Sequence, residues 1–83
     1  MQKTINIQDA FLAGARRERL PLTLFLMNGF QMRGSVTAYD SFTVVLDCEG
    51  KQELIYKHAI STIAPQRNID LRGAEDAEEV SVP

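Results

Sequence analysis

The 83-residue sequence contains one cysteine, Cys48, and one histidine, His58. A single cysteine cannot form a disulfide within the chain, and with one histidine it offers too few ligands for a tetrahedral zinc site. No apolar run approaches the roughly 18–20 residues that span a bilayer, and the first residues lack the apolar segment of a signal peptide. We therefore expect a cytoplasmic protein without metal or other cofactor, whose thiol stays reduced.

The sequence also lacks the short motifs of common enzyme classes. It has neither a P-loop nor the glycine pattern of dinucleotide-binding proteins. The functional groups of a hydrolase triad could be drawn from Asp40, Ser41, His58 and Ser61. No nucleophile elbow or other spaced motif supports that use, so we do not expect an enzyme.

Size and charge indicate an oligomer with a local basic patch. A chain of this length has room for one domain, and without a disulfide or metal its natural stabiliser is self-association. The net charge of −2 argues against nucleic acid at first sight, but the charges are segregated. Three arginines lie within residues 16–19 and four acidic residues within 75–79. This pattern predicts a near-neutral body with a basic patch and an acidic tail.

A short helix is predicted at about residues 7–18. Asn6 is a favourable N-cap, and Asp9 lies at the last position of a weaker capping box. One helix face follows at the spacing i, i+3, i+4 and i+7, formed by Gln8, Phe11, Leu12 and Ala15. Pro21 prevents continuation of the helix.

Short strands are predicted from residue 20 onward. Residues 20–27 form a strand that is apolar on both faces. Asn28-Gly29 predicts a type I′ hairpin turn, and Gly34 predicts a bend or bulge in the returning strand, residues 30–39. Further strands are predicted at 42–46, 52–57 and 59–64.

One helix followed by five consecutive short strands predicts a mostly β fold. We expect an N-terminal α-helix and a strongly bent, five-stranded antiparallel barrel, with strands at about 20–64. Because Pro65 ends the sheet and apolar content then drops, residues 1–66 are the expected domain and 67–83 a flexible acidic tail.

Tyr56, Lys57 and His58 are consecutive beside a strand junction, so they cannot all face a core. The Lys57 ammonium offers three donors, and the His58 ring can donate from one nitrogen and accept at the other. Taken alone, the segment also fits an exposed strand end without a function.

The segment Tyr56-Lys57-His58-Ala59-Ile60-Ser61 resembles the second Sm motif of the Hfq proteins, a bacterial branch of the Sm-like RNA-binding proteins. Further segments match this family in order and spacing, namely Asn6 to Asp9, Arg16 to Arg19, Phe25, Asn28 to Gly34 and Tyr39 to Phe42. The resemblance covers about residues 5–65. It implies an RNA chaperone that forms a homohexameric ring, with strands of neighbouring subunits paired edge to edge. Such a ring would bury the sheet edges and repeat each weak site around an axis.

The resemblance also implies three RNA-binding surfaces. The proximal face, on the helix side, would bind uridine-rich 3′ ends through Gln8, Ser41, Phe42, Tyr56, Lys57 and His58. The lateral rim would promote annealing through Arg16, Arg17 and Arg19, with Tyr39 as a partner. The distal face would bind adenine- or purine-rich RNA through Phe25, Gly29, Phe30, Gln31, Met32, Arg33, Ser61 and Thr62. Aromatic rings can stack on bases and guanidinium groups can hold phosphates.

Three positions depart from the pattern of the family. Ser41 stands where many relatives carry a longer glutamine, which puts one base contact in doubt. Glu53 replaces an adenine-reading glutamine of some relatives, so we expect the distal face to prefer purine-and-linker repeats over triplet repeats. Ala13 replaces a polar residue seen at the rim of some relatives.

Pattern alone leaves other interpretations open. The phenylalanines at 25, 30 and 42 could belong to the core, the arginine run could be a solvated face, and the acidic tail could be inert or compete for the rim. With the resemblance, the sequence predicts that one ring brings a small RNA and a messenger RNA together, in post-transcriptional regulation and stress responses. A structural ring that scaffolds protein partners is the alternative.

Overall fold

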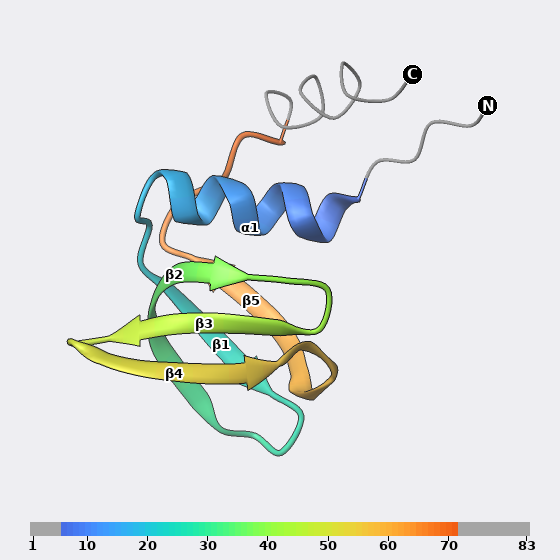
Figure 1. Cartoon of the computed structure of the whole chain (residues 1–83), viewed down its shortest axis with the longest axis vertical. Helices are drawn as coiled ribbons and strands as arrows, with labels where there is room; N and C mark the ends of the chain where they lie inside the picture. The colour runs from blue at the N-terminus through green and yellow to red at the C-terminus, as the bar shows by residue number, and fades with distance from the viewer. Residues whose placement is uncertain (1–5, 72–83) are drawn as a thin grey trace.

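The elements of the computed structural model follow the predicted order, and the structure describes residues 6–71 (Figure 1). The elements are α1 (Ile7–Arg17), β1 (Leu22–Leu26), β2 (Gln31–Tyr39), β3 (Thr43–Cys48), β4 (Lys51–Tyr56), the 3₁₀ turn η1 (Lys57–Ala59) and β5 (Ile60–Pro65). A helix followed by a bent, five-stranded antiparallel sheet confirms the predicted fold class.

Local hydrogen bonds fix both ends of α1. At its start, Asn6 Oδ1 accepts a hydrogen bond from Asp9 N at 3.1 Å, as the sequence predicts. At its end, Leu20 N donates to Ala15 O at 3.0 Å, and Arg19 N donates to a carbonyl of the last turn. These bonds form a Schellman motif, which holds Arg19 in the left-handed region at φ 49°.

The strands form one sheet in the order β4-β3-β2-β1-β5. Strand β2 pairs with two other strands. Its first part, up to Gly34, pairs with β1, and its second part, from Ser35, pairs with β3. A side chain at Gly34 would collide with the carbonyl oxygen of Asp47, so glycine permits the close approach at this point. The structure thus confirms the bend predicted at Gly34.

The β1–β2 hairpin does not use the type I′ turn predicted at Asn28-Gly29. Gly29 has a φ of 95°, but Asn28 is not among the described residues with positive φ. Asn28 Oδ1 instead accepts a hydrogen bond from Phe30 N at 3.0 Å, and Leu26 N donates to Phe30 O at 2.8 Å. The side-chain bond stabilises a three-residue loop, Met27 to Gly29, in place of the two-residue turn.

The β3–β4 hairpin has the conformation that a type I′ turn requires. Cys48 pairs with Lys51, so two residues connect the strands. These residues, Glu49 and Gly50, have φ values of 56° and 84°. Asp47 Oδ1 accepts a hydrogen bond from Gly50 N at 2.8 Å, which stabilises the turn.

The core lies between α1 and the concave side of the bent sheet. Helix α1 covers one end of the sheet (Figure 1). The buried cluster joins two helix residues to six strand residues, namely Leu12, Ala15, Leu22, Leu24, Val36, Val44, Leu46 and Ile55. β4 and β5 each have a single strand partner within residues 6–71, so both sheet edges are open.

The chain that follows β5 packs back on α1, next to the helix in Figure 1. Gln66 N donates a hydrogen bond to Pro21 O at 2.9 Å, and the Ile69 side chain occupies the space where a side chain of Gly14 would lie. The packed body therefore continues past the expected boundary at residue 66. Residues 72–83 of the expected tail lie outside the described residues.

Candidate nucleic-acid interface

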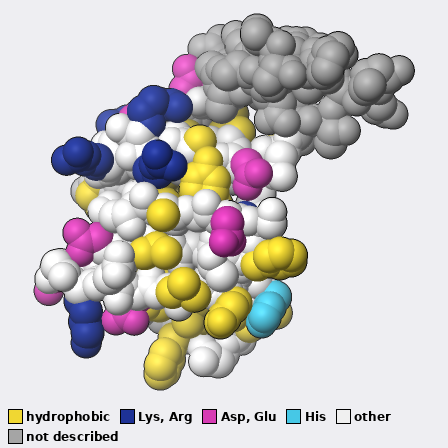
Figure 2. Space-filling model, viewed as in Figure 1, with side chains coloured by type: hydrophobic (Ala, Val, Ile, Leu, Met, Phe, Trp, Pro, Cys, Tyr) yellow, Lys and Arg dark blue, Asp and Glu magenta, His cyan; other side chains and the backbone are white. Residues whose placement is uncertain are grey.

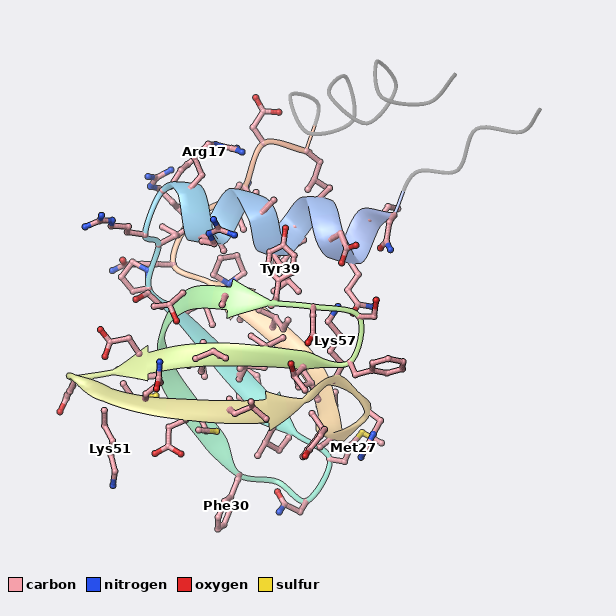
Figure 3. All side chains as sticks on the ribbon, viewed as in Figure 1. Arg17, Met27, Phe30, Tyr39, Lys51 and Lys57 are labelled. Carbon is pink, nitrogen blue, oxygen red and sulfur yellow. The ribbon has the colours of Figure 1, made fainter. Side chains whose placement is uncertain are left out.

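Lys57 lies at the centre of a polar group beneath the start of α1 (Figure 3). Its side chain is only 14% exposed, and its Nζ lies 3.5 Å from Asp9 Oδ1. The same Nζ lies 5.8 Å from the centre of the Tyr39 ring, whose hydroxyl donates to Asp9 O at 3.4 Å. The ammonium is therefore held in place by Asp9 and Tyr39, with part of its donor capacity left for a ligand.

These contacts differ from the expectation for Tyr39. The resemblance implies a partner of the rim arginines, whereas in the structure Tyr39 packs against the core and contacts Asp9 and Lys57. Asp9 itself has a role that the sequence did not reveal, because its carboxylate and Lys57 are 48 positions apart in the chain.

The loop between β2 and β3 presents Phe42 to solvent. Asp40 Oδ1 accepts hydrogen bonds from Phe42 N at 2.9 Å, Thr43 N at 2.7 Å and Thr43 Oγ1 at 2.8 Å. These bonds, chiefly the one from Phe42 N, lower the pKa of Asp40 below its ordinary value. The Phe42 ring is 75% exposed, so the interpretation of Phe42 as a core residue is wrong. Ser41, in the same loop, is exposed as well.

Tyr56 and His58 flank Lys57, and their side chains face solvent while that of Lys57 is largely buried. Their rings stack with centres 5.7 Å apart and an interplanar angle of 11°, and both side chains are exposed. Lys57 N donates to Phe42 O at 2.8 Å, which ties this turn to the loop that carries Phe42. The structure thus brings together four residues that the resemblance assigns to the proximal face, namely Phe42, Tyr56, Lys57 and His58.

A hollow of about 370 Å³ lies beside this group, between α1 and β5. Gln8 and Lys57 contribute polar groups to its wall, and Phe11 and Val44 contribute apolar surface. Ser61 and Thr62 of β5, which the resemblance assigns to the distal face, line it as well. The hollow follows the open sheet edge at β5.

The register of the sheet arranges the expected distal residues in rows. Gln31, Phe25 and Thr62 are cross-strand partners on β2, β1 and β5, so their side chains share the outer face. Ser61 Oγ donates to Phe25 O at 3.1 Å.

Met32 belongs to the next row, with Leu24 and Ile63, and packs against the core. Its side chain therefore faces away from the expected RNA surface, because successive residues of a strand point to opposite faces.

The β1–β2 hairpin carries an exposed apolar end, which lies away from α1 in Figure 3. Phe30 is 70% exposed and Met27 is 69% exposed. The sequence did not single out Met27, because Met27 continues the apolar pattern of the predicted strand at residues 20–27. On β2, the exposed side chains of Gln31 and Arg33 alternate with that of Met32.

The rim arginines (Arg16, Arg17 and Arg19) are exposed at the end of α1, where dark blue side chains gather in Figure 2. The structure shows no ion pair or hydrogen bond of their guanidinium groups among residues 6–71. Glu18, the acid within this stretch, instead pairs with Arg67, with Oε1 2.8 Å from Nη1. Arg16 and Arg19 also line a hollow of about 340 Å³ near Ser35.

The residues considered for hydrolysis take part in other contacts. Asp40 caps its own turn, Ser61 bonds to a backbone carbonyl, and His58 stacks on Tyr56. Burial, followed by the charge of Glu53, raises the pKa of the Cys48 thiol. In the described part of the chain, no group of three or more potential ligands is placed for a metal ion, and no helix is long and apolar enough to cross a membrane.

Comparison with known proteins connects these features to one family. Residues 7–70 match the model of the family described as Hfq protein. The chain is 62% identical to the RNA-binding protein Hfq of Bacillus subtilis (strain 168) over 69 residues, which cover 83% of this chain and 94% of that protein. It is 54% identical to the Exiguobacterium sibiricum protein of the same name over 82 residues, covering 98% and 99%.

A solved structure gives the same result. The fold is similar to a 1.55 Å crystal structure of "the pleiotropic translational regulator, Hfq", with a TM-score of 0.69 and 49% sequence identity. The similarity covers 71% of this chain and 98% of that chain.

Proposed function

This chain belongs to the Hfq family of RNA-binding proteins, and from that premise we propose that it is a cytoplasmic RNA chaperone with three separate RNA-binding surfaces. The observation that carries the proposal is the exposure of two phenylalanine rings in different hairpins. Phe42 is 75% exposed beside Lys57, and Phe30 is 70% exposed on the β1–β2 hairpin. Exposed rings lose favourable burial, and stacking on RNA bases restores it.

The proximal surface combines the Phe42 ring with the polar groups of Gln8 and Lys57. Uracil offers hydrogen-bonding groups on one edge and a flat face for stacking, which suits this combination. The stacked rings of Tyr56 and His58 lie at the same turn. We assign uridine-rich ends to this surface, and Ser41 to its border.

The distal surface joins Phe30 and Gly29 of the hairpin to the row of Phe25, Gln31 and Thr62. Rings beside exposed backbone and a side-chain amide suit purine bases. Arg33 lies on β2, two residues after Gln31, and its guanidinium group can bind a phosphate. Met32 contributes its backbone to this surface, because its side chain packs on the core.

The rim arginines form the third surface, which we assign to annealing. Their guanidinium groups have no intrachain partner among residues 6–71, so they can neutralise phosphates of two RNA strands at once. Arg19 occupies a backbone conformation that favours glycine, with φ 49°. An arginine kept in an unfavourable conformation is typical of a residue retained for function.

We also propose that six copies form a ring through the open edges. β4 and β5 are six residues long each, so an edge of one subunit can pair fully with the edge of the next. Leu54 on β4 is 57% exposed, and such a contact would bury it. In a ring the hollow beside β5 would be completed by the neighbouring subunit.

Separate binding surfaces are tested by paired variants. Phe42→Ala should weaken oligo-U binding by about 1–3 kcal/mol per base site, the usual loss of a stacking contact, and leave oligo-A binding nearly unchanged. Phe30→Ala should do the reverse, and fluorescence anisotropy measures both. Equal loss of both ligands in both variants would contradict separate surfaces. Absence of RNA binding in the unmodified protein would favour the scaffold alternative.

A further inference from the structure

Residues 66–69 form a strap that crosses α1 beside the rim arginines. Gln66 bonds to Pro21 at one end of the strap, and the Ile69 side chain packs directly on Gly14 at the other. Between these anchors, Arg67 Nη1 lies 2.8 Å from Glu18 Oε1. The strap therefore brings a cation from the end of the described chain to the acid in the middle of the arginine cluster.

Glu18 is in a position to reduce the charge of this cluster. It is flanked in the chain by Arg17 and Arg19, and its side chain is 29% exposed. Carboxylate and guanidinium groups form strong, often bidentate hydrogen bonds when they are within reach of each other. A free carboxylate at Glu18, next to two arginines in the chain, would lower the local positive charge and compete with phosphate for these guanidinium groups.

We propose that Arg67 is a positioning residue for RNA binding at the rim, an inference that rests on the proposed function. By pairing with Glu18, Arg67 keeps this carboxylate from the neighbouring arginines, so all three guanidinium groups stay available. The pair adds little to stability, because Arg67 is 63% exposed and the anchors at Gln66 and Ile69 already hold the strap. Its effect is on the distribution of charge at the rim.

The test compares annealing of two complementary RNAs by the full-length protein and its variants. Arg67→Ala should slow annealing about fivefold at 0.1 M salt. The expected loss is one phosphate contact at the rim, which lowers the exponent of the salt dependence by about 0.7, or a factor of about five at 0.1 M relative to 1 M. Glu18→Gln alone should have little effect. Glu18→Gln added to Arg67→Ala should restore the unmodified rate, and Arg67→Lys should retain most of it.

A matched control separates local pairing from net charge. Glu49→Gln removes a negative charge at the β3–β4 turn, so in the Arg67→Ala background it restores net charge without touching Glu18, and the rate should stay low. Restoration by Glu49→Gln, or equal gains from Glu18→Gln in both backgrounds, would overturn the inference in favour of a general charge effect. Failure of Glu18→Gln to rescue would overturn it in favour of direct RNA contact by Arg67.

A third variant distinguishes this inference from the function on which it rests. Replacing all three rim arginines by alanine should slow annealing more than Arg67→Ala does. If that variant slows annealing while Arg67→Ala does not, the inference fails and the rim assignment stands. If the triple variant anneals at the unmodified rate, both fail.

Discussion

Arg19 follows the cap of α1 with a φ of 49°, a region where a side chain clashes with its own backbone. Glycine would occupy this position without that clash and would keep the Schellman motif. Arg19→Gly should therefore raise the free energy of unfolding by about 1 kcal/mol, even though it removes a rim cation.

Urea unfolding at one fixed protein concentration measures this gain, since assembly would otherwise shift the apparent stability. Arg16→Gly is the matched control, because Arg16 lies inside the helix, where glycine should cost about 1 kcal/mol. A loss of stability in Arg19→Gly would show that the Arg19 side chain stabilises the fold by more than its backbone conformation costs.

Asp40 makes the Phe42 loop sensitive to acid. Hydrogen bonds to its carboxylate, first the one from Phe42 N, hold its pKa below the ordinary value of 3.8. Because the folded pKa is the lower one, the ionised group stabilises the loop fully above the unfolded pKa. That contribution is lost as the pH falls through the folded pKa.

We expect the unmodified protein to lose more stability between about pH 5 and pH 3 than Asp40→Asn does. Thermal unfolding at constant ionic strength across this range gives the comparison. Oligo-U binding should weaken in parallel, because Phe42 is no longer held. Identical pH profiles would mean that the carboxylate contributes nothing through its charge.

At the scale of elements, the two hairpins differ in how well their turn residues suit their conformation. Glu49 adopts a φ of 56° in the β3–β4 turn, where asparagine before glycine is favoured. Glu49→Asn should stabilise the protein by about 0.5–1 kcal/mol, because asparagine tolerates a positive φ better than glutamate does.

Asn28→Ala should act in the opposite direction. It removes the hydrogen bond from Phe30 N to Asn28 Oδ1, a loss of about 0.5–1.5 kcal/mol. Urea unfolding of both variants tests the assignment of turn types. Stabilisation by Asn28→Ala would indicate that the β1–β2 loop does not depend on its side-chain hydrogen bond.

Elements governed by local signals could be predicted from the sequence. The N-cap at Asn6, the stop before Pro21 and the bend at Gly34 each depend on neighbouring residues, and each is found in the structure. The turn at Asn28 could not be predicted in detail, because two turn types suit Asn-Gly and the Phe30 hydrogen bond selects between them.

Contacts between residues far apart in the sequence could not be predicted from local signals. The Lys57–Asp9 and Arg67–Glu18 pairs form only once the strands bring their ends to α1. The direction of Met32 depends on the register of β2 with β1, which a shift by one residue would reverse. The family resemblance implied three RNA-binding surfaces, and the structure shows which of their side chains are exposed and which pack on the core.

At the scale of the whole molecule, the open edges lead to a prediction about assembly. A chain of 9.3 kDa with two unpaired sheet edges in its described part should not persist as a monomer at micromolar concentration. Native mass spectrometry should find a species six times the mass of the chain. A dominant monomer would contradict the ring and with it the shared hollow beside β5.

We propose that this chain uses its rim arginines to bring two RNAs together. The most direct measurement is the rate at which complementary RNAs anneal, by stopped-flow fluorescence at low salt, with the unmodified protein and with Arg16, Arg17 and Arg19 all replaced by alanine. We predict that the triple variant loses most of the acceleration but still binds short oligo-U and oligo-A. The acceleration by the unmodified protein should also fall steeply with added salt, because it depends on counterion release. An unchanged annealing rate in the triple variant would contradict this role of the arginines, which would then be only a solvated surface.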